Sequence, residues 1–452
     1  MPAMTSSTHA AKDKMGDRRP PVIVVGAGLA GLVAAVKLHE SGIPVRVFEC
    51  SDGVGGRVRS DRRADGFLLD RGFQVLLDAY PAARRWIDHA ALNAGAFDSA
   101  ALLWTGRRLV PLVNPLRHPA GLPRDLTTRV FPLADKIRLA TLGAKVGLAP
   151  WQSANQAGSS LSRDVSAAEF LWSRGFSESF VNRFARPFWG GITLDPRLSG
   201  SSGPFLFTLK MFLLGSAVLP AEGVGALPAQ LLARLPTDAI SLDSRVTSVV
   251  IEEGRATGVR VARKMIAAAA VVVAADPISA KTLTGVRTLP GEEDGVPSVT
   301  VYLAGSRSPG TGPRLVLDAT RKLTINHLAP LSAVQPTYAP PGQHLVAAVI
   351  VGENARSGDL DELSVRARAD VADMLGHEPG EWRILETVRV PFSQFTQPPG
   401  IFRRLPGNVT PTRGLFLASE ATIDSSYNGA MWSGETAADM VRRELTPTFS
   451  DA

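Results

Sequence analysis

The sequence holds a single cysteine, Cys50, and only four tyrosines and seven histidines among its 452 residues. One thiol can form neither an internal disulfide nor a zinc or iron–sulfur cluster, so these classes of protein are excluded. The histidines lie far apart, without the spacing of metal ligands, so we expect no metal site. No apolar run approaches the roughly 20 residues of a membrane-spanning helix, which favours a cytoplasmic protein.

The chain also lacks a concentrated charge of one sign, although its formal net charge is +7. Its basic residues are mostly arginines scattered along the sequence, without the basic runs and interleaved aromatics of nucleic-acid-binding proteins. We therefore expect no nucleic-acid partner. The length suits two to three domains of about 100–200 residues each. Residues 1–20 are polar, and we predict that they form a disordered lead.

The clearest pattern lies near the beginning of the chain. The apolar, β-branched run 22–25 is typical of a buried parallel strand, and a helical pattern follows it and ends before Pro44. A second strand pattern, residues 45–48, ends in Glu49. The turn between the first strand and the helix consists of Gly26, Ala27, Gly28, Leu29, Ala30 and Gly31. This order of parts is that of the dinucleotide-binding strand–turn–helix–strand unit.

Each residue of this unit has a physical role. Gly26 permits the tight turn, Gly28 lets the backbone approach a pyrophosphate, and Gly31 lets helix and strand pack closely. Glu49 lies 18 residues beyond Gly31 and can accept hydrogen bonds from both hydroxyls of a ribose. A glycine-rich turn without a ligand would leave Glu49 unexplained. We therefore predict a bound adenine dinucleotide.

A second glycine motif follows closely. Gly55 and Gly56 expose backbone amides, and Arg57 directly after them can neutralise phosphate charge. Glu49 followed by this Gly-Gly-Arg run resembles the second fingerprint of the flavin amine oxidase and carotenoid (phytoene) desaturase superfamily. The resemblance implies that the dinucleotide is FAD. Residues 66–73 continue it, since they resemble the segment that runs from a small hairpin back toward the flavin.

The far end of the chain carries an independent match. Residues 414–420 are predicted to form a strand that ends in Glu420, and a final helix begins near Ser426 and contains Gly429 and Ala430. This resembles the superfamily's carboxy-terminal FAD motif, in which the acid holds the ribityl or pyrophosphate region. The small residues there let a helix amino terminus approach the isoalloxazine ring. Ser419 stands where the family usually has glycine.

The resemblance implies an α/β protein. It would have a Rossmann-like FAD-binding domain of the glutathione-reductase-like type, interleaved with an α+β substrate domain. The FAD domain would comprise residues 21–104, 219–288 and 412–446, and the substrate domain residues 105–218 and 289–411. Segment 105–218 reads mainly as helix, and segment 289–411 as strands with a helix near 361–375. Within 219–288, a three-strand insertion is implied, and the residue matching Val246 would contact adenine through its backbone.

Two apolar stretches and one histidine could belong either to the substrate site or to the core. Phe188 and Trp189 stand beside a glycine pair and resemble an active-site loop of carotenoid-desaturase relatives. Residues 205–214 would form either a greasy tunnel for a hydrocarbon or, as we favour, a buried core helix. For His327, a sheet histidine with satisfied hydrogen bonds is favoured over a proton carrier.

The resemblance implies a flavin that takes a hydride from the substrate at N5. We favour dehydrogenation or isomerisation of a small apolar molecule, with polyisoprenoids as the first candidates. A peripheral membrane contact would suit such a substrate. Sequence alone does not identify the electron acceptor or the catalytic residues. Trp189, Ser426, Tyr427 and Asn428 are candidates for substrate contact, although the last three could instead only shape the turn before the final helix.

Two alternatives stay open. In an amine oxidase, the resemblance implies an aromatic cage and a lysine near the start of a substrate-domain strand. Here that strand begins at residues 296–299 without lysine, and the whole chain has only four tyrosines. The second alternative is a flavin-binding module that has no turnover of its own.

Overall fold

The computed structural model describes residues 20–113, 130–161 and 163–446. Except for Pro20, the predicted lead 1–20 lies outside the described residues. The apolar segments near both ends of the chain join one five-stranded sheet, in which all neighbouring strands are parallel. In spatial order its strands are β10 (Ile240–Ser241), β2 (Val45–Phe48), β1 (Val22–Val25), β14 (Val271–Val273) and β20 (Leu415–Leu417).

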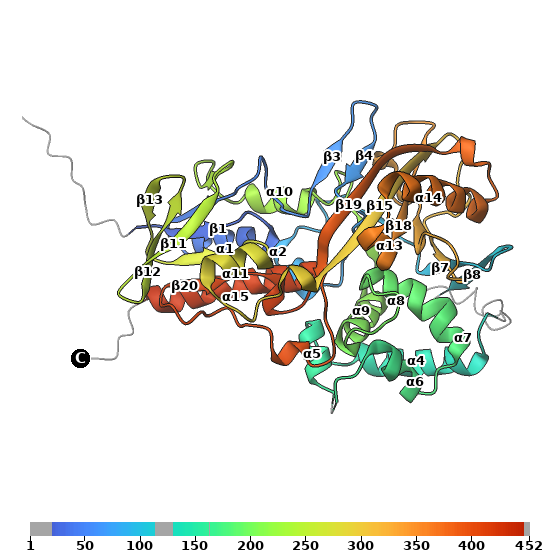
Figure 1. Ribbon diagram of the computed structural model, residues 1–452, viewed down its shortest axis with the longest axis horizontal. Coiled ribbons are helices and arrows are strands. Elements are labelled where there is room, and N and C mark those ends of the chain that lie inside the picture. Colours follow the sequence, from blue (N-terminus) through green and yellow to red (C-terminus); the bar gives the residue numbers. More distant parts are fainter. Residues whose placement is uncertain (1–19, 114–129, 162, 447–452) are drawn as a thin grey trace, which may run out of the picture.

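The two faces of this sheet are covered by different layers, as Figure 1 shows. Val22 and Val24 point toward helix α1 (Leu29–Glu40). Ile23 and Val25 belong to a separate core, which the parallel sheet shares with a three-stranded sheet formed by β11, β12 and β13. This alternation follows from the two-residue period of a strand. The predicted α/β fold of the glutathione-reductase-like type is confirmed by this arrangement. The covering elements are α10 (Ala226–Leu232), α11 (Pro277–Thr284), α15 (Tyr427–Leu445), β11 (Val246–Glu252), β12 (Arg255–Val261) and β13 (Lys264–Ala267).

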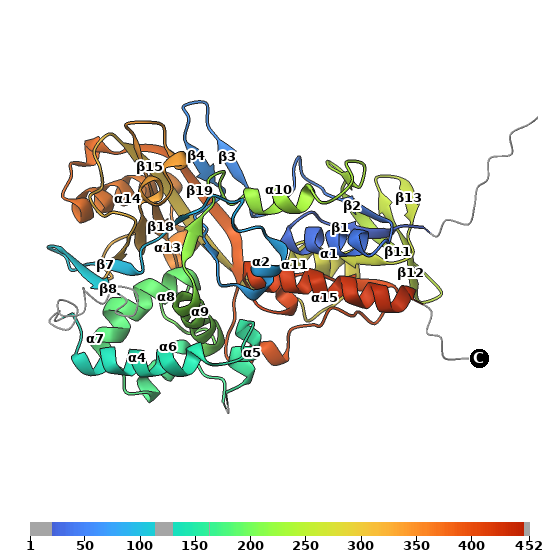
Figure 2. The same ribbon diagram turned by 180° about the vertical axis from the view of Figure 1, so that it is seen from behind.

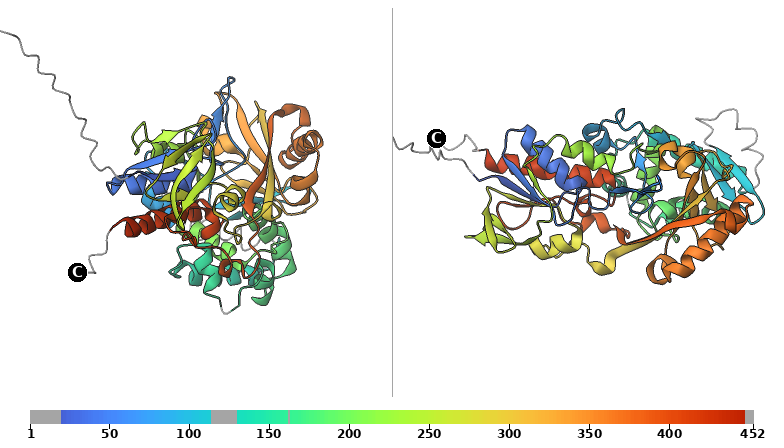
Figure 3. Two further views of the ribbon diagram at one scale, coloured as in Figure 1. Left: turned by 60° about the vertical axis from the view of Figure 1, so that its left-hand side comes forward. Right: turned by 90° about the horizontal axis from the view of Figure 1, so that it is seen from above.

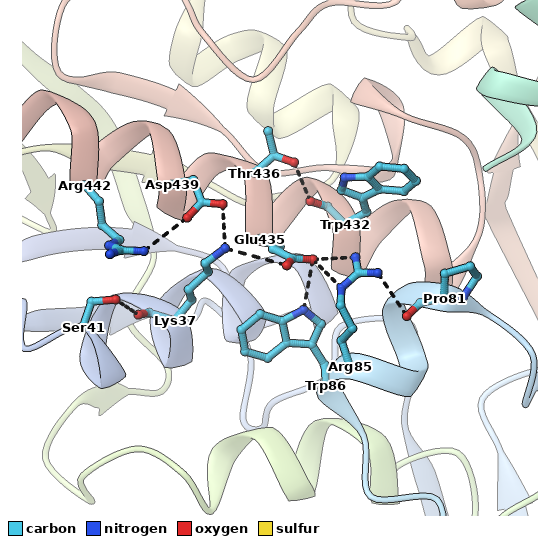
Figure 4. Close-up of polar contacts among 10 residues, drawn as sticks. All are labelled: Lys37, Ser41, Pro81, Arg85, Trp86, Trp432, Glu435, Thr436, Asp439 and Arg442. Atoms are coloured by element: carbon cyan, nitrogen blue, oxygen red, sulfur yellow. Dashed lines mark hydrogen bonds and ion pairs between the residues drawn. The ribbon is translucent and has the colours of Figure 1, made fainter. Parts of the chain in front are cut away.

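Helix α15 lies beside α1, and the two are seen side by side in Figure 3. A Cβ at Gly434 would stand 2.1 Å from the carbonyl oxygen of Ala30, so only glycine allows this approach of the two helices. Polar contacts reinforce it (Figure 4). Glu435 accepts hydrogen bonds from Arg85 of α2 (Pro81–Trp86) at 2.6 Å, and Lys37 of α1 pairs with Asp439 at 2.6 Å.

A mixed seven-stranded sheet forms the second body of the protein. Its spatial order is β19 (Arg383–Phe395), β15 (Gly295–Gly305), β18 (His344–Ile350), β17 (His327–Ala329), β16 (Leu315–Asp318), β7 (Ala100–Trp104) and β8 (Leu109–Val113). Helix α14 (Leu360–Leu375) packs on one face of this sheet, at the position predicted for a helix near 361–375. The short helices α12 (Leu331–Val334) and α13 (Glu353–Ser357) lie at its strand ends.

Strand β7 corrects one predicted boundary. We assigned residues 21–104 to the FAD domain, but Ala100–Trp104 pairs in parallel with β16 and antiparallel with β8. Its continuous apolar run, Ala-Ala-Leu-Leu-Trp, fits a strand of either sheet, and only the distant partner strand decides which sheet it joins. The division into domains otherwise stays a prediction.

A helical layer lies under this sheet, and Figure 2 shows it from behind. It confirms that the described residues of segment 105–218 are mainly helical, apart from β8 and the start of β9 (Ala217–Leu219). Its helices are α4 (Leu133–Gly147), α5 (Ala154–Ser159), α6 (Ala167–Ser173), α7 (Glu178–Phe180), α8 (Arg186–Ile192) and α9 (Ser202–Leu214), with a π-helical turn at Val181–Ala185. Two small sheets complete the fold: β3 (Ser60–Arg62) with β4 (Leu68–Asp70), and β5 (Leu76–Leu77), β9 (Ala217–Leu219) and β6 (Gly95–Ala96).

Candidate active site

One cavity of about 1270 Å³ connects the parallel sheet with the helical layer. It exceeds the roughly 1,000 Å³ at the upper end of typical small-molecule pockets. Its walls include Gly28 and Glu49 of the dinucleotide unit at one end, and Leu139 and Leu213 of the helical layer at the other. The volume and this extent can hold two molecules, a dinucleotide and a substrate. We call the part lined by α4, α8 and α9 the apolar arm.

The first glycine turn is shaped by close approaches. Gly26 has φ +103°, and a Cβ there would lie 2.6 Å from the carbonyl oxygen of Ala274. A Cβ at Gly31 would lie 2.0 Å from the carbonyl oxygen of Gly26. At Gly28, by contrast, a Cβ would meet no protein atom within 4 Å. Gly28 caps α1 without a side-chain hydrogen bond, so the first amides of the helix remain available to an anion.

Glu49 is held in place at the end of β2. Its Oε2 accepts a hydrogen bond from the Ala27 amide at 2.7 Å, and its Oε1 accepts from the Ser51 amide at 2.9 Å and the Ser51 hydroxyl at 2.8 Å. Glu49 is buried in the protein but lines the cavity. These bonds orient the carboxylate, so it can receive ribose hydroxyls without rearrangement.

The second glycine motif lies directly beside the first. The Gly55 amide donates to the Ala27 carbonyl at 2.8 Å, and Gly28 and Gly55 form an isolated parallel bridge. Gly55 and Gly56 have φ values of +108° and +59°, in the left-handed region that favours glycine. The two turns together form one glycine-rich wall of the cavity, which Leu29 and Ala30 also line, and we call this wall the cradle. That the cradle holds a pyrophosphate stays a prediction.

Arg57 joins three distant parts of the chain. Its Nη2 donates to Glu420 in an ion pair, and its Nη1 donates to the carbonyl oxygen of Ser393 on β19 at 2.8 Å. We expected Arg57 to neutralise phosphate and Glu420 to hold the ribityl or pyrophosphate region. The structure brings both to the cavity wall and pairs them with each other. Neither residue's direct contact with the cofactor is tested, so those roles stay predictions.

The carboxy-terminal motif begins at a well-defined helix cap. The Ser426 hydroxyl accepts a hydrogen bond from the Gly429 amide at 2.9 Å and donates to the buried carboxylate of Asp424. A Cβ at Gly429 would lie 2.1 Å from the Asp424 carbonyl oxygen, so glycine is required there. Ala430, one residue further, lines the cavity. The cap therefore directs the start of α15 toward the cavity.

The four predicted substrate contacts lie in different environments. Ser426 and Tyr427 line the cavity, and the Tyr427 hydroxyl donates to Gln74 Oε1 at 2.5 Å. Asn428 is fully buried: its Oδ1 accepts from the Ala82 amide at 3.0 Å, and its Nδ2 donates to the Gln152 carbonyl at 2.8 Å. It lies behind the cavity wall and acts as a structural clamp, in contrast to the predicted substrate contact.

Trp189 belongs to both the core and the cavity. It is 2% exposed, lines the cavity, and donates from Nε1 to the Thr208 hydroxyl at 3.2 Å. Its neighbour Phe188 also lines the cavity. The segment expected as a loop is helix α8, because a π-helical turn continues directly into it and Pro187 is accommodated in its first turn.

Helix α9 confirms the buried core helix favoured for residues 205–214, and part of it also lines the cavity. Phe205 and Leu206 are buried in the main core. Leu209 and Phe212 line the cavity and are accompanied there by Leu213. A helix that is apolar all round can serve both surfaces at once.

Several cavity-lining residues were not predicted. Val246 lines the cavity as expected, at the start of β11, but Arg245, Ser279 and Leu283 beside it had no recognisable signal. The same holds for Ser393 of β19, whose contribution is a backbone carbonyl and leaves no side-chain pattern. His327 was expected as a satisfied sheet histidine. It lies in β17, but its buried Nε2 has no hydrogen-bond partner among the described residues, and its ring lines the cavity.

Comparison with known proteins agrees with this site. A family model described as flavin containing amine oxidoreductase matches residues 29–442. The chain belongs to this family. It is therefore an oxidoreductase, and its cofactor is FAD, as the sequence predicted. The cradle beside Gly28, the oriented carboxylate of Glu49 and the start of α15 at the cavity fit that cofactor.

Individual relatives share different parts of the chain. Coproporphyrinogen III oxidase of Propionibacterium freudenreichii subsp. freudenreichii is 33% identical over 182 residues, which are 38% of this chain and 31% of the relative. The match thus spans about a third of that protein. Hydroxysqualene dehydroxylase of Rhodopseudomonas palustris is 25% identical over 93% of this chain and 98% of its own length. A solved oxidoreductase from Methanosarcina mazei has a TM-score of 0.73 at 17% identity, covering 93% of this chain and all of that one.

Two further features of residues 20–113, 130–161 and 163–446 bear on function. None of the helices in these ranges combines the length and apolar character needed to cross a membrane. Within the same ranges, no three acidic, histidine or cysteine side chains gather closely enough to hold a metal ion.

Proposed function

We propose that this oxidoreductase dehydrogenates a long apolar substrate of the polyisoprenoid type, by hydride transfer to N5 of the flavin. The apolar arm of the cavity carries the proposal. Its lining is mostly hydrocarbon and aromatic, which suits a molecule recognised by shape and by loss of water-exposed surface. The apolar lining residues include Leu139, Ala140, Gly143, Phe188, Trp189, Leu209, Phe212 and Leu213, with Phe131 and Phe184 beside them, and the polar ones are Lys136 and Thr208.

The aromatic residues of the arm form a continuous packed series. The ring centroids of Phe184 and Phe188 lie 5.5 Å apart, and those of Phe188 and Phe212 lie 5.2 Å apart. Rings at these distances support one another, so the wall keeps its shape without a ligand. A preformed apolar wall lowers the entropic cost of ordering a flexible hydrocarbon chain.

The chain's own residues bind, orient and exclude water. Bound FAD supplies a hydride acceptor. Trp189 and the phenylalanines of the arm shield the reacting carbon from solvent. Ser426 fixes the start of α15 through its cap, and Arg57 with Glu420 fixes the cavity wall beside it. Formation of the carbon–carbon double bond also releases one proton from the neighbouring carbon, and this proton passes to water or to a polar group of the cavity wall.

An amine substrate is disfavoured by the same cavity. Ser298 lines it near the start of β15, where the resemblance implies a lysine in amine oxidases. Two of the four tyrosines, Tyr302 and Tyr338, lie outside the cavity lining and donate to Asp70. Only Tyr80 and Tyr427 line the cavity and could contribute tyrosine rings to an aromatic cage around a cation.

Two further observations support the apolar proposal. The hydroxysqualene dehydroxylase relative, whose name specifies a polyisoprenoid substrate, aligns over nearly its full length.

The second observation is an exposed apolar rim, since Leu148 and Leu214 line the cavity and are exposed to solvent by 90% and 48%. We propose that this rim contacts a membrane peripherally when substrate enters. Retention on liposomes tests this contact, and a Leu148→Ser variant with undiminished retention would contradict it.

The decisive experiment is anaerobic reduction of the FAD-loaded protein. We expect squalene, phytoene or geranylgeraniol to bleach the flavin absorbance, whereas putrescine and benzylamine do not. Rapid bleaching by an amine, with hydrogen peroxide formed in air, would favour the amine-oxidase alternative. Bleaching by dithionite but by none of these compounds would favour the module without turnover. Assays with oxygen and a soluble quinone then identify the electron acceptor.

A further inference from the structure

Tyr80 lies where the apolar arm meets the part of the cavity that the start of α15 lines. Its ring stacks on that of Phe207 in α9, with centroids 6.0 Å apart and an angle of 15° between the rings. Both residues line the cavity. Burial raises the pKa of Tyr80, and the charge of nearby Asp424, just before α15, raises it further. Tyr80 therefore adjoins both parts of the cavity.

The backbone at Tyr80 is held in place directly before α2. Its amide donates to the Leu77 carbonyl at 3.0 Å, and its carbonyl accepts from the Arg84 amide at 3.0 Å. The stacked contact with Phe207 restrains the ring as well. The hydroxyl at the end of this ring therefore has a defined position before a ligand binds.

The Tyr80 hydroxyl is unpaired and can be reached from the cavity. It has no hydrogen-bond partner among the described residues, and it is not one of the side-chain atoms there that are both unpaired and fully enclosed. Part of its surface is therefore open. Because Tyr80 is 7% exposed and its hydroxyl lies deep inside the fold, this open part faces the cavity that Tyr80 lines. Buried hydroxyls are nearly always paired, so this one points to a ligand.

Other polar side chains of the cavity differ from Tyr80. Hydroxyl and amide groups that already bond to protein atoms belong to Thr193, Thr208, Ser298, Gln394, Ser426 and Tyr427. The Ser425 hydroxyl and the Gln397 side-chain nitrogen have no partner among the described residues, but both residues are half-buried, so water can bond to them. Tyr80 is buried against an aromatic ring, where a hydroxyl without a partner is costly.

We propose that the Tyr80 hydroxyl donates a hydrogen bond to an oxygen of the substrate, a hydroxyl or carbonyl oxygen on an otherwise hydrocarbon molecule. This inference rests on the proposed function, because it takes the apolar arm as the substrate site. Since burial raises the pKa of Tyr80, the phenol keeps its proton at neutral pH and can donate it to a hydrogen bond. A donor fixed at this end of the arm holds the oxygen there, and the hydrocarbon chain extends along the arm.

Two matched ligands test the proposal with the FAD-loaded protein. Geranylgeraniol carries one hydroxyl, and the hydrocarbon of the same skeleton carries none. Retention of each tritiated ligand at one detergent concentration gives its dissociation constant, with the flavin reduced by dithionite so that it accepts no hydride. The ratio of the hydrocarbon's constant to the alcohol's should fall about 2- to 10-fold in Tyr80→Phe, the range that one hydrogen bond supplies. Phenylalanine keeps the stacked ring, so an unchanged ratio would overturn the proposal.

Two controls exclude other partners for the ligand and for the hydroxyl. Ser425→Ala removes another open hydroxyl of the cavity and should leave the ratio unchanged. A fall in Ser425→Ala and not in Tyr80→Phe would assign the ligand oxygen to Ser425 instead. Tyr80→Phe should also leave the FAD affinity of the ligand-free protein unchanged. A weaker FAD affinity with an unchanged ligand ratio would place the hydroxyl against the flavin and overturn the proposal.

A measurement on the unaltered protein complements the variants. The chain has only four tyrosines, so protein labelled with ¹³C at tyrosine Cζ gives four resonances. The resonance that is missing in Tyr80→Phe belongs to Tyr80. It should shift more with geranylgeraniol than with the hydrocarbon, because Cζ carries the hydroxyl. Equal shifts with both ligands would contradict the proposed hydrogen bond.

The outcomes separate this inference from the function beneath it. If the unaltered protein retains both ligands and their ratio is the same in Tyr80→Phe, the inference fails and the apolar site stands. If the unaltered protein retains neither ligand, the proposed apolar site itself fails and the inference falls with it.

Discussion

Arg57 and Glu420, which are 363 positions apart in the sequence, form an ion pair at the wall of the cavity. Arg57 follows the second glycine turn, and Glu420 follows the last strand of the parallel sheet. Each was expected from a separate motif, and the structure makes them one unit. Because Arg57 also donates to the Ser393 carbonyl, this unit ties the FAD-binding sheet to β19 of the second sheet.

The Arg57 contacts predict that its replacement lowers FAD retention. Arg57→Ala removes the guanidinium and leaves the Glu420 carboxylate unpaired at the cavity wall, so we expect a lower ratio of bound FAD to protein. Arg57→Lys should recover only part of the FAD retention, since an ammonium group cannot reproduce the planar set of donors of a guanidinium. The matched control is Arg62→Ala, which breaks an exposed ion pair with Glu222. Equal FAD content in the Arg57→Ala and Arg62→Ala proteins would contradict the assignment.

Two glycines of the first turn should respond differently to alanine. A Cβ at Gly28 meets no protein atom, so Gly28→Ala should leave the melting temperature of the FAD-free protein unchanged. The same Cβ occupies the cradle and should weaken FAD binding about tenfold or more, or about 1.4 kcal/mol. Gly31→Ala collides with the Gly26 carbonyl and should destabilise the fold by about 1–3 kcal/mol. Titration with FAD and thermal unfolding check both, and unchanged FAD affinity in Gly28→Ala is the contrary result.

Gly143 offers a test of the apolar arm. It is buried on α4 beside Leu213, both residues line the cavity, and an added Cβ there would have ordinary contact with Leu213 at 3.5 Å. Gly143→Leu should narrow the arm and weaken squalene binding more than binding of the shorter geranylacetone. Ile137→Phe, on the exposed side of the same helix, is the control and should change neither. A uniform loss for both ligands would mean that the long chain does not reach α4.

Asp70 predicts a pH dependence of stability. Burial raises the pKa of this carboxyl to about 6, against partial compensation by hydrogen bonds from Ser60, Val224 and Tyr338. The folded state therefore binds the proton more tightly than the unfolded state. The protonated Asp70 carboxyl therefore contributes its full stabilisation below the pKa that Asp70 has in the unfolded chain. This contribution is lost as pH rises through about 6.

The measurement compares Asp70→Asn, which does not titrate, with the unaltered protein. Relative to that variant, the free energy of unfolding of the unaltered protein should fall by about 1 kcal/mol between pH 5 and pH 7. Denaturant titrations at several pH values check this. A constant difference would show that Asp70 is ionised in the fold across this range.

Local patterns predicted the dinucleotide unit because its parts are contiguous in the sequence. The strand at 22–25, its glycine turn and Glu49 each depend on neighbours within about one βαβ unit. Helices α14 and α15 were found for the same reason, since each has a clear apolar period or cap. The family resemblance then supplied the cofactor, which spacing alone would have left as any adenine dinucleotide.

The missed features depend on distant partners. Ala100–Trp104 could join either sheet until β16 was known to lie beside it. The surroundings of His327 include the Asn326 side chain, which the Pro187 carbonyl holds, and Gly191, both far away in sequence. Asn428 was placed at the substrate because of its neighbours, but the Ala82 and Gln152 backbones hold it behind the wall. Such relationships leave no periodic trace in the sequence.

The central claim is that an apolar chain reaches the flavin through this cavity and gives up a hydride there. Anaerobic titration of the FAD-loaded protein with a polyisoprenoid, followed by flavin absorbance, tests it most directly. We predict bleaching in proportion to the substrate added, and a weaker response of Gly143→Leu to the longest chains. Bleaching by an amine and by no polyisoprenoid would contradict it.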